Sequence, residues 1–174
     1  RLIATRIVPG AWEFLAAQAM VVLGSWDGKR GVWPSLVFGP PGFAATRDGS
    51  TVELALASRL TDAGDPLWDN LCCSERIGLL VIDLATRHRL RISGHLRASG
   101  QPTDRLEIAV ERAYPNCPKY IQRRRLRLEQ ACSGPLDVRI SRALTEQQVG
   151  MIAAADTCFV ASMQRDSGID VSHR

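Results

Sequence analysis

Arginine side chains are the groups in this sequence with the clearest capacity for chemistry. Twenty of the 22 basic residues are Arg, and the only lysines are Lys29 and Lys119. A planar guanidinium binds a phosphate or carboxylate group through two parallel hydrogen bonds. Arg89 and Arg91 alternate with apolar residues, so a strand would present both on one face. The arginine bias therefore suits a phosphate ligand, although GC-rich coding gives the same bias without any function.

Cysteine and histidine residues indicate neither a metal site nor a covalent catalyst. The five cysteines are odd in number, include an adjacent pair and form no CxxC motif, unlike zinc sites and disulfide scaffolds. Free thiols in a reducing compartment fit this usage best. Cys117 is open to two interpretations, a buried structural residue or a reactive thiol. We expect His88 in a turn and His95 partly buried, and no GxSxG motif or Cys-His constellation indicates hydrolysis.

The overall charge is only mildly basic, with a formal net charge of +4 and a pI near 9.0. The run RRRLR at 123–127 suggests nucleic-acid binding, but aromatic residues are few and Glu129 and nearby acids offset its charge. The longest charge-free apolar stretch, 77–82, is far shorter than the roughly 20 residues of a membrane-spanning helix. We therefore expect no nucleic-acid partner, no membrane association and a cytoplasmic location.

Tight turns and alternating apolar residues predict a small antiparallel β-barrel with short helices, a mainly β fold. Asp-Gly pairs at 27–28 and 48–49 mark two hairpins. The apolar run 77–84 predicts a central strand, Pro34 places its strand at an edge or bulge, and Gly94 interrupts an alternation as a bulge does. We expect about six strands and two or three short helices, drawn from the extended segments 19–26, 31–38, 43–47, 51–58, 77–84, 87–97 and 106–110 and from the helical segments 12–18 and 65–73.

Residues 141–174 begin a second structural unit. Thr145 and Gln148 form a capping box that starts a helix, and an apolar strand, a turn and a strand ending in Ser follow it. We interpret 1–140 as one barrel and 141–174 as the helix and opening strands of a second, truncated copy. The alternative is a C-terminal strand that completes the single barrel. Laid without gaps on 14–37, the stretch 151–174 keeps five identities: Ala16/Ala153, Ala17/Ala154, Ser25/Ser162, Gly31/Gly168 and Ser35/Ser172.

Four segments together resemble the pyridoxamine 5′-phosphate oxidase-like family of FMN-binding split barrels. They read VWPSLVFGPPGF, GDPLWDNL, RIGLLVIDLATRHRLRISG and, at 113–124, AYPNCPKYIQRR. The last is similar to a signature of a bacterial branch that often has two tandem barrels. The resemblance implies a six-stranded antiparallel split β-barrel with peripheral helices. In that branch the second barrel carries Ser-His-Arg-Gly-Gly, which Ser172, His173 and Arg174 begin to match, whereas the first copy has Ser35 but lacks the His-Arg pair.

The resemblance implies an FMN site, which needs cationic and hydroxyl donors for the phosphate and apolar walls with a few polar groups for the ring. For Arg59, Arg89 and Arg91 the alternative is an ordinary charge in a loop or on a solvated strand face. The segment 119–123 either closes over an anionic ligand or caps the barrel end against a partner subunit. The candidates are Ser58, Arg59, Arg89 and Arg91 for the phosphate, Trp33 and Ser35 beside the ring, and Lys119, Tyr120, Gln122, Ser172, His173 and Arg174 around them.

The function expected from the resemblance is that of an FMN-dependent oxidoreductase with the flavin between two barrels and a small-molecule redox substrate. The alternative is a non-catalytic protein that binds flavin or haem, with the first barrel serving as a dimerisation scaffold. A half-built second barrel exposes unpaired strand edges, which a missing segment or another subunit must cover. We therefore expect a homodimer.

Overall fold

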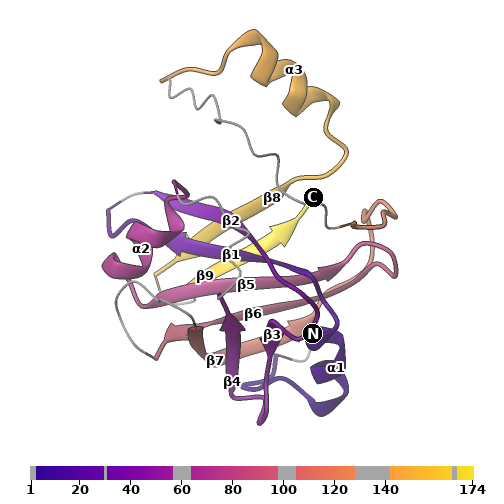
Figure 1. The fold of residues 1–174 in the computed structure, drawn as a ribbon. Helices are drawn as coiled ribbons and strands as arrows, with labels where there is room; N and C mark the ends of the chain where they lie inside the picture. The colour runs from indigo at the N-terminus through magenta and orange to yellow at the C-terminus, as the bar shows by residue number, and fades with distance from the viewer. Residues whose placement is uncertain (1–2, 30, 57–63, 98–104, 128–141, 166–167) are drawn as a thin grey trace.

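The structure is a computed structural model that describes residues 3–29, 31–56, 64–97, 105–127, 142–165 and 168–174. A curled antiparallel sheet dominates it, a two-stranded hairpin lies against that sheet, and helices lie at the periphery (Figure 1). This part of the chain is mainly β with short helices, as the turn and alternation patterns predict. None of its helices combines the length and apolarity needed to cross a membrane.

Seven strands form the large sheet in the order β2-β1-β5-β6-β7-β4-β3, and neighbouring strands are antiparallel. The six strands that the split-barrel resemblance implies are one fewer than the seven of this sheet, in which the predicted strand 43–47 is reduced to a two-residue strand at the edge. β4 runs at a steep angle to β5 and β6 (Figure 1), so the sheet curls into a half-barrel. The strands are β1 (Met20–Trp26), β2 (Val32–Phe38), β3 (Ala44–Ala45), β4 (Thr51–Ala55), β5 (Arg76–Asp83), β6 (His88–Leu96) and β7 (Arg105–Pro115).

Local sequence signals locate most of these strands correctly. Gly28 and Gly49 of the two Asp-Gly pairs have positive φ angles of 76° and 74°, a conformation that glycine adopts without steric cost. β2, which contains Pro34, is an edge strand, and the register of β6 against β7 shifts between Ser93 and Gly94. The edge strand and the bulge are therefore confirmed.

β7 continues to Pro115, well beyond the predicted end at Val110. Its second half pairs with β6 and carries Arg112 and Tyr114, whose side chains line a cleft shared with the C-terminal hairpin. Because another layer of protein lies on this side of β7, polar residues there do not mark the end of the strand. The end of such a covered strand cannot be found from the pattern of its apolar residues alone.

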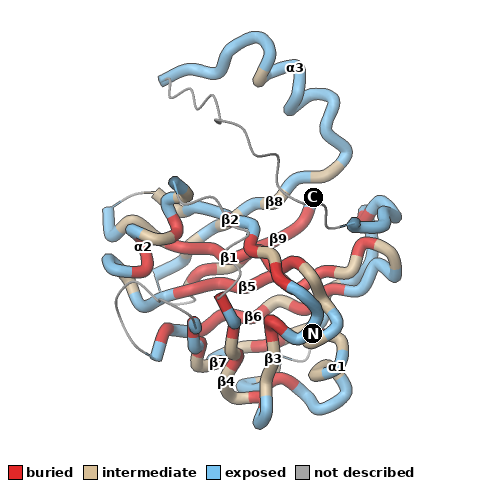
Figure 2. Tube along the Cα trace, viewed as in Figure 1, coloured by how far each residue is buried: buried red, intermediate tan, exposed pale blue. Residues whose placement is uncertain are grey.

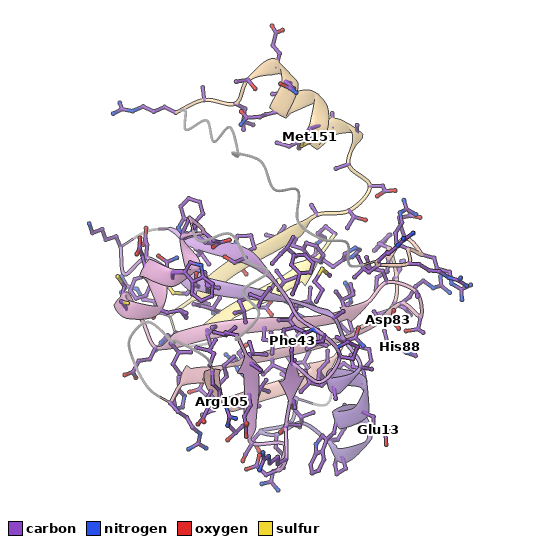
Figure 3. The ribbon with its side chains drawn as sticks, viewed as in Figure 1. Glu13, Phe43, Asp83, His88, Arg105 and Met151 are labelled. Carbon is purple, nitrogen blue, oxygen red and sulfur yellow. The ribbon has the colours of Figure 1, made fainter. Side chains whose placement is uncertain are left out.

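The helices are short: η1 (Pro9–Ala11), α1 (Trp12–Ala16), α2 (Leu67–Cys73) and α3 (Glu146–Ala154). Before α2, Asp65 Oδ1 accepts a hydrogen bond from the Leu67 N–H at 2.8 Å, which confirms the expected capping role of Asp65. The predicted capping box of α3 is also present. α3 has no buried residue (Figure 2), and Met151 on it lies apart from the sheet (Figure 3).

Apolar side chains form two clusters on opposite faces of the sheet. The larger cluster fills the inside of the curl and includes Leu15 of α1 and Leu67 of α2. The smaller cluster lies on the outer face, where side chains of β1 and β5 meet the C-terminal hairpin. β1 and β5 are therefore buried on both faces, which explains their nearly continuous apolar sequences. The outer cluster contains Met20, Val22, Leu80, Ile82, Leu84, Ile121 and Val171.

The C-terminal hairpin, β8 (Phe159–Gln164) and β9 (Gly168–His173), forms a separate two-stranded sheet. β9 packs on the outer face of β5 and β6, and β8 approaches β2. Ile169 and Val171 of β9 have no exposed surface. In the described residues the hairpin thus adds a second layer to the half-barrel and no strand to its sheet.

Two glycines make room for this layer. Gly24 and Gly78 are cross-strand partners in β1 and β5. A Cβ at Gly24 would lie 2.7 Å from Val171 Cγ2, and a Cβ at Gly78 would lie 2.7 Å from the backbone oxygen of Ile169. Both distances are shorter than a van der Waals contact, so a side chain at either position forces β9 away.

We predict that Gly78→Ala loosens the hairpin from the sheet. The clash is with backbone oxygen, which cannot rotate aside, so the substitution should lower the free energy of unfolding by about 1–3 kcal/mol, as overpacking does. Chemical denaturation measures this loss, and amide hydrogen exchange should accelerate in β9. Gly10→Ala is the matched control, because a Cβ there meets no atom within 4 Å. Equal stability of the two variants would contradict the tight packing of β9.

Candidate functional site

Four of the predicted ligand-binding residues, Arg89, Arg91, Ser172 and His173, meet where β9 packs on β6. We call this contact the hairpin seam, and it lies where β9 passes over the sheet in Figure 1. Two segments that are far apart in the sequence, LRISG and the Ser-His-Arg motif, come together there. The seam consists of Arg89, Arg91, Arg112 and Tyr114 on the sheet and of Asp170, Ser172 and His173 on β9.

Arg89 joins three segments of the chain. Its Nη1 donates to the backbone oxygen of His173 at 3.3 Å, and its Nη2 donates to that of Cys117 at 2.7 Å. Only 9% of Arg89 is exposed, so the interpretation as a solvated strand face is wrong. Charge-assisted bonds of this kind stabilise by roughly 1.5–3 kcal/mol each. Arg89 therefore holds β9 and the loop after β7 against β6.

Arg91 is paired with Asp170 of the hairpin. Its Nε donates to Asp170 Oδ1 at 2.8 Å, its Nη2 forms an ion pair with Oδ2, and its guanidinium lies 5.4 Å from the centre of the Tyr114 ring. The Tyr114 hydroxyl donates to the same Oδ1 at 3.3 Å. The Arg91 side chain is 11% exposed, so here too the solvated-face interpretation is wrong. This bidentate pair neutralises both charges at one end of the seam.

His173 lies at the other end of the seam and is 1% exposed. Within the described residues neither ring nitrogen has a hydrogen-bond partner, and the ring meets Phe159 edge-on at 5.7 Å. Burial lowers the pKa of His173 because it disfavours the charged imidazolium, and the nearby Arg89 and Arg174 lower it further. The ring is therefore neutral at pH 7 and keeps one donor and one acceptor available.

The loop after β7 carries the predicted signature residues. Ile121 is 5% exposed and packs into the outer cluster, so it anchors the loop at the end of the sheet. Lys119, Tyr120 and Gln122 are exposed, and Lys119 Nζ lies 5.0 Å from the centre of the Tyr120 ring. Cys117 is also exposed, so its interpretation as a buried structural residue is wrong. The backbone oxygen of Cys117 accepts a hydrogen bond from Arg89 and so attaches this point of the loop to β6.

Other predicted residues do not reach the seam. Two strands separate β2 from β6 in the sheet order, and Trp33 on β2 is 45% exposed. Ser35 is buried and donates to Asp65 Oδ1 at 2.6 Å, where it supports the start of α2. Ser58 and Arg59 lie outside the described residues. Ser172, by contrast, is a seam residue and is 8% exposed, and Arg174, which follows β9, donates to the backbone oxygen of His173.

Arg112, Tyr114 and Asp170 are seam residues that the sequence reasoning missed. Arg112 and Tyr114 alternate with buried Ala113, so extending the strand pattern past Val110 would have found them. Arg112 is half-buried and forms no hydrogen bond or ion pair with the described part of the chain. No local signal marks Asp170, because its role depends on the docking of β9.

The two remaining histidines lie outside the seam. His88 is the first residue of β6, opposite Asp83 in the β5–β6 hairpin, where Figure 3 shows both residues at one end of the sheet. His95 pairs with Glu111 at 3.3 Å, and with 47% of its side chain exposed it is more open than predicted. No group of three His, Cys, Asp or Glu side chains among the described residues could hold a metal ion.

The donors of the seam fit the ring of a flavin better than its phosphate. The buried ring nitrogens of His173 lack partners among the described residues, as expected for groups that meet the polar edge of a ligand. Arg89 and Arg91, by contrast, already bind backbone oxygens and Asp170. The seam therefore offers polar ring contacts, and the predicted phosphate residues Ser58 and Arg59 are not part of the described structure.

No protein-family model and no curated protein matches this sequence. Among solved structures, the chain is similar to HupZ of Group A Streptococcus, with 13% identity over 63% of this chain and 94% of that one and a TM-score of 0.45. It is also similar to a Lactobacillus delbrueckii protein assigned by name to the pyridoxamine 5′-phosphate oxidases (12% identity, 64% and 95% covered, TM-score 0.44). An F420 reductase has 14% identity, 63% and 98% covered and a TM-score of 0.40. Likenesses at this level assign neither family nor function to this chain.

We predict that His173 makes the protein less stable in acid. In the folded protein its pKa lies below the ordinary value of about 6.5, which the residue regains on unfolding. Below pH 6.5 the unfolded chain therefore binds a proton at His173 that the folded chain does not bind. The free energy of unfolding should therefore fall by up to about 1.4 kcal/mol per pH unit below pH 6.5, with no effect of His173 above pH 7.5. Urea denaturation between pH 4.5 and 8 measures this slope.

His173→Leu should remove this part of the pH dependence while it keeps the site apolar and filled. The same measurement on Gln147→Leu, a change at an exposed residue of α3 that carries no titratable group, should leave the slope as it is in the parent protein. A slope that persists unchanged in His173→Leu would show that other groups cause the loss of stability in acid.

Proposed function

We propose that this protein binds FMN at the hairpin seam and acts as an FMN-dependent oxidoreductase. The observation that carries the proposal is the contact of Arg89 with the backbone of His173, which joins the LRISG strand to the Ser-His-Arg motif. The sequence resemblance places a flavin between two barrels, and this contact lies between the first half-barrel and the hairpin that resembles the start of a second. A small-molecule redox substrate would then reach the flavin from the solvent side of the seam.

In this proposal the chain supplies binding and orientation. His173 offers one donor and one acceptor to the polar edge of the flavin ring, and Phe159 beside it offers an apolar edge. Ser58 and Arg59 hold the phosphate, and the loop of Lys119, Tyr120 and Gln122 closes over the ligand. Trp33 and Ser35, which do not reach the seam, have no part in this arrangement. Bound FMN supplies hydride transfer, which needs positioned hydrogen-bond donors and no protein nucleophile.

A non-catalytic flavin- or haem-binding protein is the second candidate. The observation that favours it is the engagement of Arg89 and Arg91 in contacts that hold the hairpin in place. The first copy also has Ser35-Leu36-Val37 where the second has Ser172-His173-Arg174. In this case the first half-barrel is a scaffold, and the protein would bind the ring without turning over a substrate.

We also propose that 141–174 is the opening of a second barrel copy, and the pairing of the two hairpins supports this division. Placing 14–37 on 151–174 carries the pair Val22↔Leu36 onto Phe159↔His173, and five of the six β8–β9 pairs match a β1–β2 pair under this shift. The sixth, Gln164↔Gly168, matches the backbone hydrogen bond from Asp27 to Gly31. A Cβ on Gly24 would lie 3.6 Å from Cβ of Ala161, its counterpart in the second copy. Equivalent positions that face each other in this way are expected at an approximate two-fold axis.

Equivalent residues of the two copies differ in burial. Leu15 and Leu23 have no exposed surface inside the first half-barrel, whereas their counterparts Ile152 and Val160 are 61% and 45% exposed. These two side chains lie on the face of the second copy that corresponds to the inside of a barrel. A complete second barrel or another subunit would bury this face.

The cysteines support the proposed cytoplasmic location. All four cysteines in the described part of the chain are free thiols, including the neighbouring Cys72 and Cys73. Exposed free thiols persist in a reducing compartment.

We predict saturable binding of FMN to the 174-residue protein, measured by quenching of flavin fluorescence. Loss of one charge-assisted phosphate contact in Arg59→Ala, or of the ring contact in His173→Leu, should weaken binding by about tenfold, which corresponds to about 1.4 kcal/mol. Arg47→Gln is the control, because Arg47 is 85% exposed and makes only a weak pair with Glu53. Circular dichroism would verify the fold of each variant.

A protein that neither carries nor takes up FMN would overturn the flavin proposal as a whole. Stable binding without reduction of the bound flavin by a nicotinamide donor would favour the non-catalytic alternative. If FMN bound to the parent protein and to His173→Leu with equal affinity, the flavin ring would not contact His173 in the seam.

We predict a homodimer that covers the exposed face of Ile152 and Val160. Light scattering of the purified protein should give twice the mass of one chain. The double substitution Ile152→Asp and Val160→Asp would place two charges in the apolar contact and should yield monomers. Val8→Asp changes an equally exposed residue outside this face and should leave the dimer intact. A monomer at high protein concentration would contradict the prediction.

A further inference from the structure

One cleft of the hairpin seam is distinct from the contacts assigned to the flavin. It has a volume of about 260 Å³ and lies beside β6 and β7 at the turn end of the β8–β9 hairpin, where Gln164 pairs with Gly168. The sheet side is formed by Ser93, Arg112 and Tyr114, and the hairpin side includes Ser162, Met163 and Asp170. Ligand pockets usually measure roughly 300–1,000 Å³, so this cleft suits a ligand smaller than FMN.

The charge of the cleft comes from Arg112. Asp170 also lines the cleft, but Arg91 and the Tyr114 hydroxyl occupy its two carboxylate oxygens, so the Arg91–Asp170 pair is electrically neutral. Arg112 forms no hydrogen bond or ion pair with any described residue, although it is half-buried. A partly desolvated guanidinium attracts anions more strongly than one in bulk water, and its planar fork binds a carboxylate or phosphate through two hydrogen bonds.

The other walls define the body of the ligand. The Tyr114 ring and the Met163 side chain are apolar surfaces beside Arg112, and Ile3 of the N-terminal segment adds a third. The hydroxyl groups of Ser93 and Ser162 line the same space and can donate further hydrogen bonds to an oxyanion. This combination of one cation, hydroxyl donors and apolar walls matches a small molecule with an anionic head and a short apolar or aromatic body.

We propose that the Arg112 cleft is a binding site for a small organic anion, with the carboxylate or phosphate head on Arg112 and the apolar body against Tyr114 and Met163. The site is formed jointly by the first half-barrel and the hairpin, so it exists only when β9 is docked. It does not require bound FMN. If FMN does bind at the seam, this cleft adjoins it and would hold the substrate, which is then an organic acid or a phosphate ester.

Isothermal titration calorimetry of the FMN-free protein tests this site with sodium benzoate, sodium acetate and inorganic phosphate as probes. We expect saturable binding of benzoate, tighter than that of acetate because the apolar walls contact the ring. Arg112→Gln should weaken benzoate binding at least tenfold, whereas Arg47→Gln, an equal loss of charge on the exposed β3–β4 connection, should not change it. Tighter binding of phosphate than of benzoate would identify the head group as a phosphate.

Tyr114→Leu separates the contribution of the apolar wall from that of the Arg112 cation. It should weaken benzoate binding but leave phosphate binding intact, since phosphate has no apolar body. Absence of saturable binding for all three probes, or equal benzoate affinity in the parent protein and in Arg112→Gln, would overturn the proposal. Displacement of benzoate by FMN would overturn the assignment of two separate sites, whereas failure of FMN to bind at all would leave the anion site standing.

Discussion

The close approach of β9 to the outer face of the sheet is the constraint on which the remaining features depend. It is possible because Gly24 and Gly78 stand side by side on β1 and β5 and leave the space that Ile169 and Val171 occupy. The docked hairpin buries β1 and β5 on their second face. It also turns one side of β6 and β7 from a solvent-facing surface into an interface, which creates the seam.

Docking of the hairpin requires that every charge on that surface find a partner or lose its charge, because desolvation of an unpaired ion is costly. Arg89 is compensated by two backbone oxygens and Arg91 by the bidentate carboxylate of Asp170. His173 stays neutral because burial and two neighbouring arginines oppose its protonation. Arg112 is only half-buried, so it keeps its charge although it forms no hydrogen bond or ion pair with the described residues.

The β1–β2 and β8–β9 hairpins have matching strand registers but bury opposite faces. In the β1–β2 hairpin, the side that includes Leu23 packs inside the curl of the sheet. In the β8–β9 hairpin, the corresponding side carries exposed Val160, and the other side, with Phe159 and Ala161, packs on the outer cluster. The two hairpins thus meet through the outer face of the sheet.

Sequence alone determined the features that depend on neighbouring residues. Asp-Gly turns, the edge strand with Pro34, the bulge at Gly94 and the capping box of Thr145 all act within a few residues, so local rules predicted them. The burial of Arg89 and the role of Asp170 as the counter-ion of Arg91 were decided only by tertiary structure. A strand that alternates arginine with leucine looks the same in sequence whether water or another strand covers its polar face, and only the docking of a hairpin some eighty residues away distinguishes the two.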